Sequence, residues 1–400
     1  MAAISKYWNE IIHPGVTCAT LSHPGRTCED HIRRQMRVTI GGNLKFFLPI
    51  SIVRLFMLCY TRKAVSVEIL LQALFELFSE AFNGWAVSNC WSAGFCAMYR
   101  WFGFINNYSV SLPSSPGTLL MFLMPAYVKM SHSRAMFNVF LECWMKSREH
   151  PLVEYARESR LVGTVSFMAI SAAIGYFAQR TKAMEFWFFS PLKKNLNPES
   201  EQHHKPCHHR HTCQSYIFDG MRTCFTFGLL LELVRKLINV APRISSEPAA
   251  AILEAFSRIR LRFVAFLTLY NGLFRLTTCA LARHRRKVTE SDSTVAACIS
   301  GLSYALSPNY NIFNLGVAAA IQNAWNFITE KYDKVQWIQQ VNKLSFSSIV
   351  WVFLMNYNMY ARAYYPYAMS KFALKFTDIC SGLQAQTAAE CLGKVAMGFS

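Results

Sequence analysis

Two short stretches of cysteine and histidine contain the residue types of a metal site. Each has three such residues, with four other residues between one and the next, and the second stretch lies 185 positions after the first. The six residues are Cys18, His23 and Cys28 in the first stretch and His203, His208 and Cys213 in the second. Thiolate and imidazole are preferred ligands of Zn²⁺, and a structural zinc site needs four of them around a tetrahedral ion. The pattern predicts metal binding, with Zn²⁺ as the ion.

A fourth ligand is needed for each stretch. His13 or His31 could complete the first, and Cys207 or His211 the second. If the two halves of the chain pack together, the two stretches could instead share one ion. The alternative without metal is that these are helix entries or loop residues that pack against lipid headgroups, since the spacing is neither a Cys-x2-Cys pair nor a zinc finger.

The repeated stretches predict an internal duplication. Three further matches follow at an offset of 181: 52–54 with 233–235, Trp144 with Trp325, and the apolar segment 161–178 with 342–359. The expected organisation is a Cys/His-containing N-terminal segment, a first membrane repeat, a Cys/His-rich linker, a second membrane repeat and a tail. Their ranges are 1–41, 42–195, 196–217, 218–375 and 376–400.

Composition places these repeats in a membrane. The chain of 400 residues is 52% apolar and 14% aromatic, which is rich for a soluble protein. Several windows approach the roughly 20 apolar residues that span a bilayer. The segments 161–178 and 310–328 contain no charge. We expect an all-α, polytopic transmembrane bundle with about eight to ten membrane segments.

Charged residues inside these apolar segments are candidate functional groups, because ionisable side chains are expensive in a membrane. Arg54 and Arg235 occupy equivalent positions near the ends of their segments, where snorkelling to the interface explains them. Arg275 lies in the middle of its segment, and Glu232 is its candidate partner. The pair would serve either a polar path through the bundle or a structural ion pair.

The net charge of +18 is distributed over the loops that border the apolar segments. The expected partners are therefore the bilayer and its anionic headgroups, together with further copies of the chain in a homo-oligomer, and not nucleic acid. Catalytic motifs such as Gly-x-Ser-x-Gly, a phosphate-binding Gly-rich loop or His-Glu-x2-His are absent from the sequence. We predict no enzymatic activity, no catalytic residues and no organic cofactor.

Three motifs resemble the transmembrane protein 135 family. The first Cys/His stretch is similar to the Cys-x4-His-x5-Cys segment that opens that family, with a second gap one residue shorter. Gly41-Gly42-x-Leu44-Lys45-x3-Pro49 resembles the segment that follows it, and Cys213-x-Ser215-Tyr216 resembles the start of its C-terminal membrane region. The resemblance implies a multi-pass protein of the peroxisomal membrane, with a mitochondrial membrane as the alternative.

The function that this resemblance implies is non-enzymatic: peroxisome organisation, mitochondrial fission and lipid homeostasis. Two other classes remain open. A transporter or channel would have its site near the midplane between the repeats, where Arg275 and Glu232 would matter. A metal-dependent membrane enzyme would use the Cys/His segments.

Overall fold

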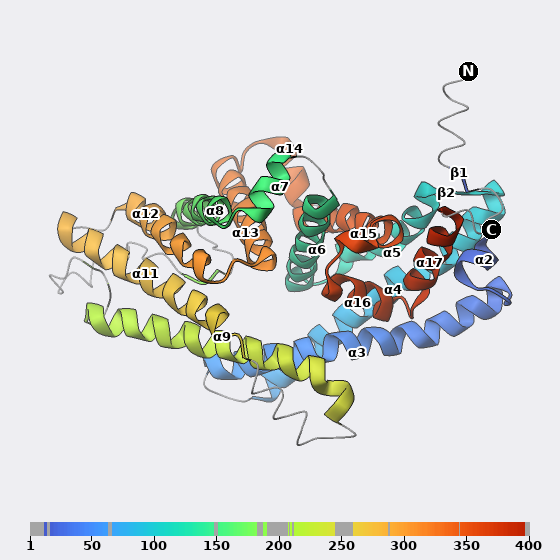
Figure 1. The fold of residues 1–400 in the computed structure, drawn as a ribbon, viewed down its shortest axis with the longest axis horizontal. Coiled ribbons are helices and arrows are strands. Elements are labelled where there is room, and N and C mark those ends of the chain that lie inside the picture. The colour runs from blue at the N-terminus through green and yellow to red at the C-terminus, as the bar shows by residue number, and fades with distance from the viewer. Residues whose placement is uncertain are drawn as a thin grey trace. The chain divides into compact units, whose positions relative to one another are not determined.

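The computed structural model is almost entirely helical (Figure 1). It describes residues 12–13, 17–62, 66–147, 151–181, 187–189, 207, 209, 212–244, 259–286, 289–343 and 345–396. The all-α prediction is confirmed. The strands described are a single antiparallel pair of two residues each, β1 (Ile12–His13) and β2 (Ile105–Asn106).

The chain forms two compact units, 1–148 with 340–400 and 149–339. The first unit holds α2 (Cys18–Ser22), α3 (Cys28–Arg62), α4 (Val67–Phe102), η1 (Asn107–Val110), η2 (Leu112–Ser114), α5 (Ser115–Leu119), η3 (Leu120–Leu123), α6 (Ala126–Ser147), α15 (Phe346–Tyr364), η6 (Pro366–Ala368), α16 (Lys371–Cys380) and α17 (Gln384–Ala396). The second holds α7 (Pro151–Glu158), α8 (Arg160–Arg180), α9 (Cys213–Ile244), α11 (Leu261–Arg285), α12 (Glu290–Ser300), η5 (Gly301–Leu306) and α13 (Tyr310–Lys331), and α14 (Gln336–Lys343) crosses the boundary.

Local signals set the helix ends. Ser66 caps α4 by accepting from the Ile69 N–H, and Ser159 caps α8 by accepting from the Val162 N–H. The long helix α4 ends at Gly103, whose φ of 75° is the left-handed conformation that glycine adopts without strain. These caps leave the chain free to reverse between long antiparallel helices.

The same order of helices occurs twice. A pair of long helices, a short helix that runs on into a 3₁₀ turn, a 22-residue helix, an 8-residue helix and a final long helix appear as α3 to α8 and again as α9 to α15. The 22-residue helices α6 and α13 begin at residues 126 and 310, which are 184 apart. The order agrees with the duplication that the Cys/His stretches indicate.

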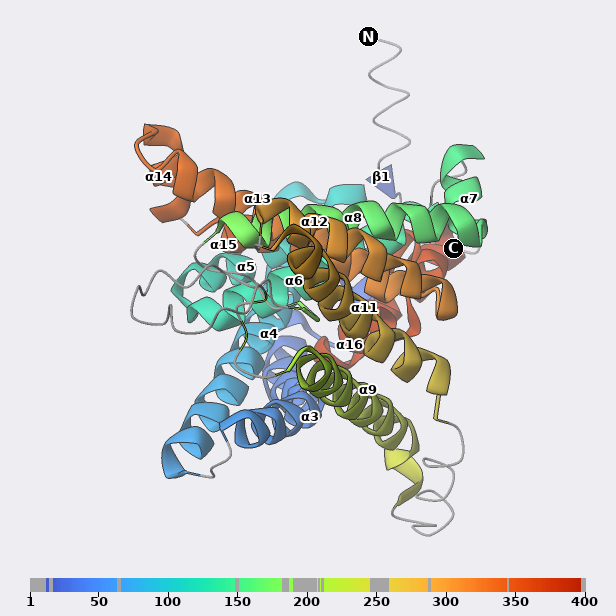
Figure 2. The same cartoon turned by 90° about the vertical axis from the view of Figure 1, so that its left-hand side faces the viewer.

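The final helix of each series packs with the other series. Helix α8 follows α6 and α7 in sequence but lies against α12, η5 and α13, and α15 lies against α6 and α5. In Figures 1 and 2 the green α8 runs beside the orange α12 and α13. The compact units therefore differ from the predicted consecutive repeats, 42–195 and 218–375, because the last helix of each is exchanged.

Each unit has its own apolar core. In the first unit the core gathers side chains from α3, α4, α6, α15 and α16, with Trp91 and Trp351 among its largest members. In the second unit Phe167 of α8 packs against Tyr304, with ring centroids 4.5 Å apart, and against Phe266. The exchanged helices thus contribute central residues to both cores.

Helix α4 has a largely apolar outer face and buries polar side chains beside apolar ones. Its exposed positions form an apolar face: Val67, Leu70, Leu71, Leu74, Phe75, Phe78 and Phe82. Its buried positions include polar side chains: Glu76, Glu80, Asn83, Ser88, Asn89 and Ser92. Helix α3 shares this in part, since Ile40 and Leu48 are exposed, but its exposed positions also include Arg33 and Lys45. A helix in water carries polar residues on its outer face, and the outer face of α4 departs from that pattern.

Two of the described helices, α8 and α11, are long and apolar enough by composition to cross a bilayer. Eight described helices have 19 residues or more, which is near the length that a membrane requires. The buried polar residues on helices such as α4 lower their average hydropathy.

Candidate metal centres

The first Cys/His cluster is built where α2, α3 and α4 meet. Cys18 and Cys28 are the first residues of α2 and α3, His23 caps the end of α2, and Cys96 lies on α4, six residues before that helix ends. Gly25, at φ +73°, turns the chain between His23 and Cys28. The turn returns Cys28 to the start of α2, so local structure gathers three ligands and α4 supplies the fourth.

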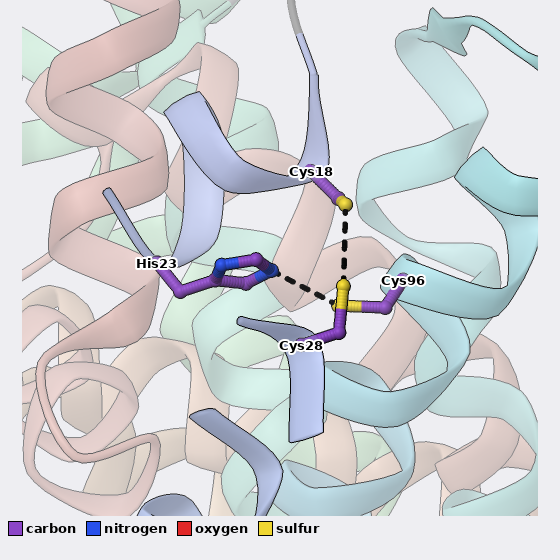
Figure 3. A group of neighbouring side chains, drawn as sticks. All are labelled: Cys18, His23, Cys28 and Cys96. Atoms are coloured by element: carbon purple, nitrogen blue, oxygen red, sulfur yellow. Dashed lines mark hydrogen bonds between the residues drawn. The ribbon is translucent and has the colours of Figure 1, made fainter. Parts of the chain in front are cut away.

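The four ligand atoms lie within 4.8 Å of one another (Figure 3). The sulfurs of Cys18 and Cys28 are 3.8 Å apart, and the Cys96 sulfur is 3.4 Å from Nε2 of His23. With Zn–S bonds of about 2.3 Å and a Zn–N bond of about 2.0 Å, a tetrahedral site has edges of about 3.8 Å between two sulfurs and about 3.5 Å between sulfur and nitrogen. These two distances have the lengths expected for the edges of a tetrahedral Cys3His site.

A second hydrogen bond orients the imidazole of His23. Its Nδ1 lies 2.9 Å from the carbonyl oxygen of Arg26. A carbonyl oxygen only accepts, so Nδ1 carries the proton and donates it. Nε2 is then left with the lone pair that a metal ion needs, which is the arrangement seen around metal-ligating histidines.

Burial disfavours ionisation of one thiol in each cluster. Desolvation, together with the neighbouring Cys28 sulfur, raises the pKa of the Cys18 thiol. Desolvation and the Cys213 sulfur likewise raise the pKa of Cys207 in the second cluster. A bound cation reverses this preference, because thiolates are the ligands and metal binding releases their protons.

The second cluster consists of Cys207, His209, Cys213 and Cys279, whose ligand atoms also lie within 4.8 Å of one another. The Cys207 and Cys213 sulfurs are 3.7 Å apart, and the Cys279 sulfur is 3.5 Å from Nε2 of His209. These distances again match the two edge lengths of a tetrahedral zinc site. The His209 ring stacks on Tyr216, with centroids 4.6 Å apart.

The two clusters occupy equivalent places in the helix order. Cys28 and Cys213 begin α3 and α9, the first helices of the two series. Cys96 and Cys279 each lie six residues before the end of the next helix, α4 or α11. Each cluster therefore joins the two helices of an antiparallel pair at the same end, within a single compact unit.

The predicted ligands are partly reassigned. Cys18, His23 and Cys28 come together as expected, but the fourth ligand is Cys96 and not His13 or His31. Cys213 joins Cys207, one of the two residues considered for the second fourth ligand. His203, His208 and His211 lie outside the described residues. The signal that sequence reasoning missed is a pair of cysteines 183 residues apart, Cys96 and Cys279, which lie within apolar segments of the sequence.

The predicted intramembrane charges are placed as follows. Arg54 and Arg235 lie within α3 and α9, but their side chains are outside the part of the chain that the structure describes. Arg275 donates from Nη1 to the Tyr216 carbonyl oxygen at 2.5 Å and stacks over the Tyr216 ring. Glu232 accepts from the Arg260 N–H at 3.3 Å. Because α9 and α11 are antiparallel, Arg275 and Glu232 face opposite ends of the pair, about 22 Å apart along α11.

Comparison with known proteins gives no relative. No protein-family model, no curated protein and no solved structure matches the chain.

Proposed function

We propose that this chain is an integral membrane protein without enzymatic activity, built on two duplicated helical series. The observation that carries the proposal is the apolar outer face of α4, which lies on a helix that also buries polar side chains. Phe75 and Phe78 are each 60% exposed on it, whereas Glu80 is 1% exposed. An apolar side chain left in water forgoes roughly 1.5–3 kcal/mol, so the seven exposed apolar residues of this face would cost on the order of 10 kcal/mol in water. A lipid environment removes that cost.

The buried polar side chains also support a membrane environment, because they form hydrogen bonds between helices. The Asn89 amide donates to the Thr39 hydroxyl at 3.0 Å, and the Ser88 hydroxyl donates to the Cys380 carbonyl oxygen at 3.0 Å. Interhelical hydrogen bonds of this kind contribute to helix association where lipid supplies no hydrophobic drive. A polar interior with an apolar exterior is the expected pattern for a polytopic bundle.

Membrane integration is tested by extracting membranes of expressing cells with alkaline carbonate. An integral protein stays in the pellet and is released by detergent. Quantitative recovery of the chain in the carbonate supernatant would contradict the proposal. Protease protection in sealed vesicles then counts the segments that cross.

The organelle and the process are proposed from the resemblance to the transmembrane protein 135 family, supported by the chain's basic loops. The chain would act in the peroxisomal membrane, or alternatively a mitochondrial membrane, in peroxisome organisation, mitochondrial fission and lipid homeostasis. Co-localisation of a tagged full-length chain with markers of both organelles tests the first part. Peroxisome number, mitochondrial length and neutral-lipid content in cells that lack the chain test the second, and unchanged values would refute the role.

The Cys/His clusters would hold zinc in a structural role. Three thiolates and one imidazole suit Zn²⁺, and four protein ligands leave no open position for a substrate or water. This argues for a stabilising function and against the metal-dependent enzyme. Metal analysis of the purified protein tests the assignment, which fails if the protein binds less than one zinc per chain.

A transporter is the second candidate, because the first unit contains a cavity with polar groups in its wall. The cavity has a volume of about 80 Å³ and is lined mainly by aromatic and aliphatic side chains, with Glu80 and His132 among them. His132 Nε2 is 3.9 Å from the Glu80 carboxylate. Flux into liposomes that contain the protein tests this function, and equal flux with Glu80→Gln would count against a transport path through the cavity.

A further inference from the structure

We propose that the two Cys3His clusters are paired zinc sites of unequal lability: the first holds its ion permanently, and the second exchanges it. The inference rests on the proposed zinc occupancy. It assigns different behaviour to two sites with the same ligands at equivalent places in the helix order. The difference must therefore come from what surrounds the ligands.

The first cluster is part of the main core of its unit. Cys18 and Cys96 belong to the same apolar cluster as Trp91, Trp351 and Phe95, which extends over several helices. Opening this site to a chelator requires those contacts to separate. Local opening is rarest where buried apolar contacts are dense, so ligand exchange here follows a large structural fluctuation.

The C-terminal helix α17 adds a second layer over the first cluster. Nε2 of Gln384, on α17, contacts the Ser22 hydroxyl and lies 2.9 Å from Nε2 of His31. Oε1 of Gln384 accepts a hydrogen bond from the Ser92 hydroxyl. The His31 ring in turn lies 4.8 Å from the ring of the ligand His23. Helix α17 thus fixes side chains that lie next to the first cluster.

Within the part of the chain that the structure describes, the second cluster lies in a small core of its own. Its buried apolar members are Cys207, Cys279 and Ala282, with Cys213 and Tyr216 packed against them. This core is separate from the aromatic core of the second unit. The ligand His209 is half-buried, whereas His23 of the first cluster is 4% exposed. Among the described residues, fewer buried apolar side chains surround these ligands, so we expect them to open more often.

The equivalence of the ligands makes the comparison controlled. Both sites use Nε2 of one histidine and three sulfurs, and two of their edges agree to within 0.1 Å, at 3.8 and 3.7 Å between sulfurs and 3.4 and 3.5 Å between sulfur and nitrogen. We therefore expect the two sites to have a similar intrinsic affinity for Zn²⁺. A difference in the rate of zinc release between the clusters would therefore reflect packing. The faster site would give the chain one ion that can respond to free zinc or thiol reagents.

The experiment uses the full-length protein in detergent. Zinc content is measured first, and release into excess EDTA with a chromogenic zinc indicator is then followed over time. The expected result is two zinc ions per chain, with one released at least tenfold faster than the other. The parent protein is also alkylated during EDTA treatment, and the reaction is stopped after the fast phase and read by mass spectrometry. Among the cluster cysteines, Cys207, Cys213 and Cys279 should be modified.

Variants assign the phases. Cys213→Ser should remove the fast phase and Cys28→Ser the slow phase. Cys298→Ser and Cys90→Ser, at half-buried cysteines outside both clusters, should retain two ions and both rates. The alkylation result needs no variant and stands even if Cys28→Ser fails to fold.

Three outcomes would overturn the inference. A single release rate for two ions, or early alkylation of Cys18, Cys28 and Cys96, refutes unequal lability while leaving zinc occupancy intact. Less than one zinc per chain refutes zinc occupancy itself, and the lability proposal with it. Membrane integration is measured separately by carbonate extraction, so it is unaffected by either result.

Discussion

Truncation of Phe167 should destabilise the unit against which α8 packs, and not the unit that holds the rest of its own series, α3 to α6. Phe167 is fully buried in the second unit, stacked on Tyr304 at 4.5 Å between centroids and 6.0 Å from Phe266. Removal of a buried Phe side chain costs about 3–5 kcal/mol. The aromatic pairs add roughly 0.5–1.5 kcal/mol each. We expect Phe167→Ala to lower the stability of the second unit by about 4 kcal/mol or more.

The assay is the denaturant dependence of cysteine alkylation, read site by site by mass spectrometry. In Phe167→Ala, Cys224 of the second unit should react at lower denaturant than in the parent protein, while Cys143 of the first unit should be unchanged. Both cysteines are buried and lie outside the Cys/His clusters, so bound metal does not protect them. Leu161→Ala is the matched control, because Leu161 is 73% exposed on the same helix and should change neither profile. Earlier reaction of Cys143, with Cys224 unchanged, would refute the helix exchange.

Three further changes test the packing and the environment. Gly175→Val should destabilise the second unit by about 1–3 kcal/mol in thermal unfolding, since a Cβ there would lie 2.7 Å from that of Ala297; unchanged stability would contradict the close approach of α8 and α12. Arg362→Met should cost about 3 kcal/mol by stranding the Asp378 carboxylate, whose oxygens are 2.8 and 3.1 Å from the guanidinium, and a second change, Asp378→Leu, should restore most of the stability. Phe78→Asp should reduce the membrane-bound fraction, because a carboxylate at a lipid-facing site costs about 2.5–3.5 kcal/mol, whereas an unchanged membrane-bound fraction would oppose the membrane proposal.

The duplication could be predicted from the sequence, but its register could not. The apolar segment 161–178 matches 342–359 at an offset of 181, yet the buried faces of α8 and α15 correspond at 184. All six buried residues of α8 have a buried counterpart there: Thr164, Phe167, Ser171, Ile174, Gly175 and Ala178 pair with Ser348, Trp351, Met355, Asn358, Met359 and Arg362. A shift of three residues is close to one helical turn of 3.6, so hydrophobic periodicity hardly distinguishes the two offsets. Packing distinguishes them, because each position meets different neighbours.

The fourth ligand of each cluster was beyond sequence reasoning for a different reason. Three ligands are near one another in sequence, and their spacing is a local property. Cys96 and Cys279 reach the clusters only because long antiparallel helices return to the starting end, 68 and 66 residues after Cys28 and Cys213. In an apolar helix a cysteine has the composition of a core residue. The length of the helices places each of these two cysteines next to two other sulfurs and an imidazole.

The spacing of the local ligands is the part that the two clusters do not share. The first has Cys-x4-His-x4-Cys, and the second, as assembled, has Cys-x-His-x3-Cys. Both nevertheless reach the same sulfur–sulfur and sulfur–nitrogen distances at the same end of the helix pair. In the first cluster the short helix α2 and the turn at Gly25 lie between Cys18 and Cys28. In the second cluster Cys213 follows Cys207 by six residues. What the two series have in common is therefore one histidine and three cysteines whose ligand atoms lie within 4.8 Å of one another, an arrangement that would suit a bound ion.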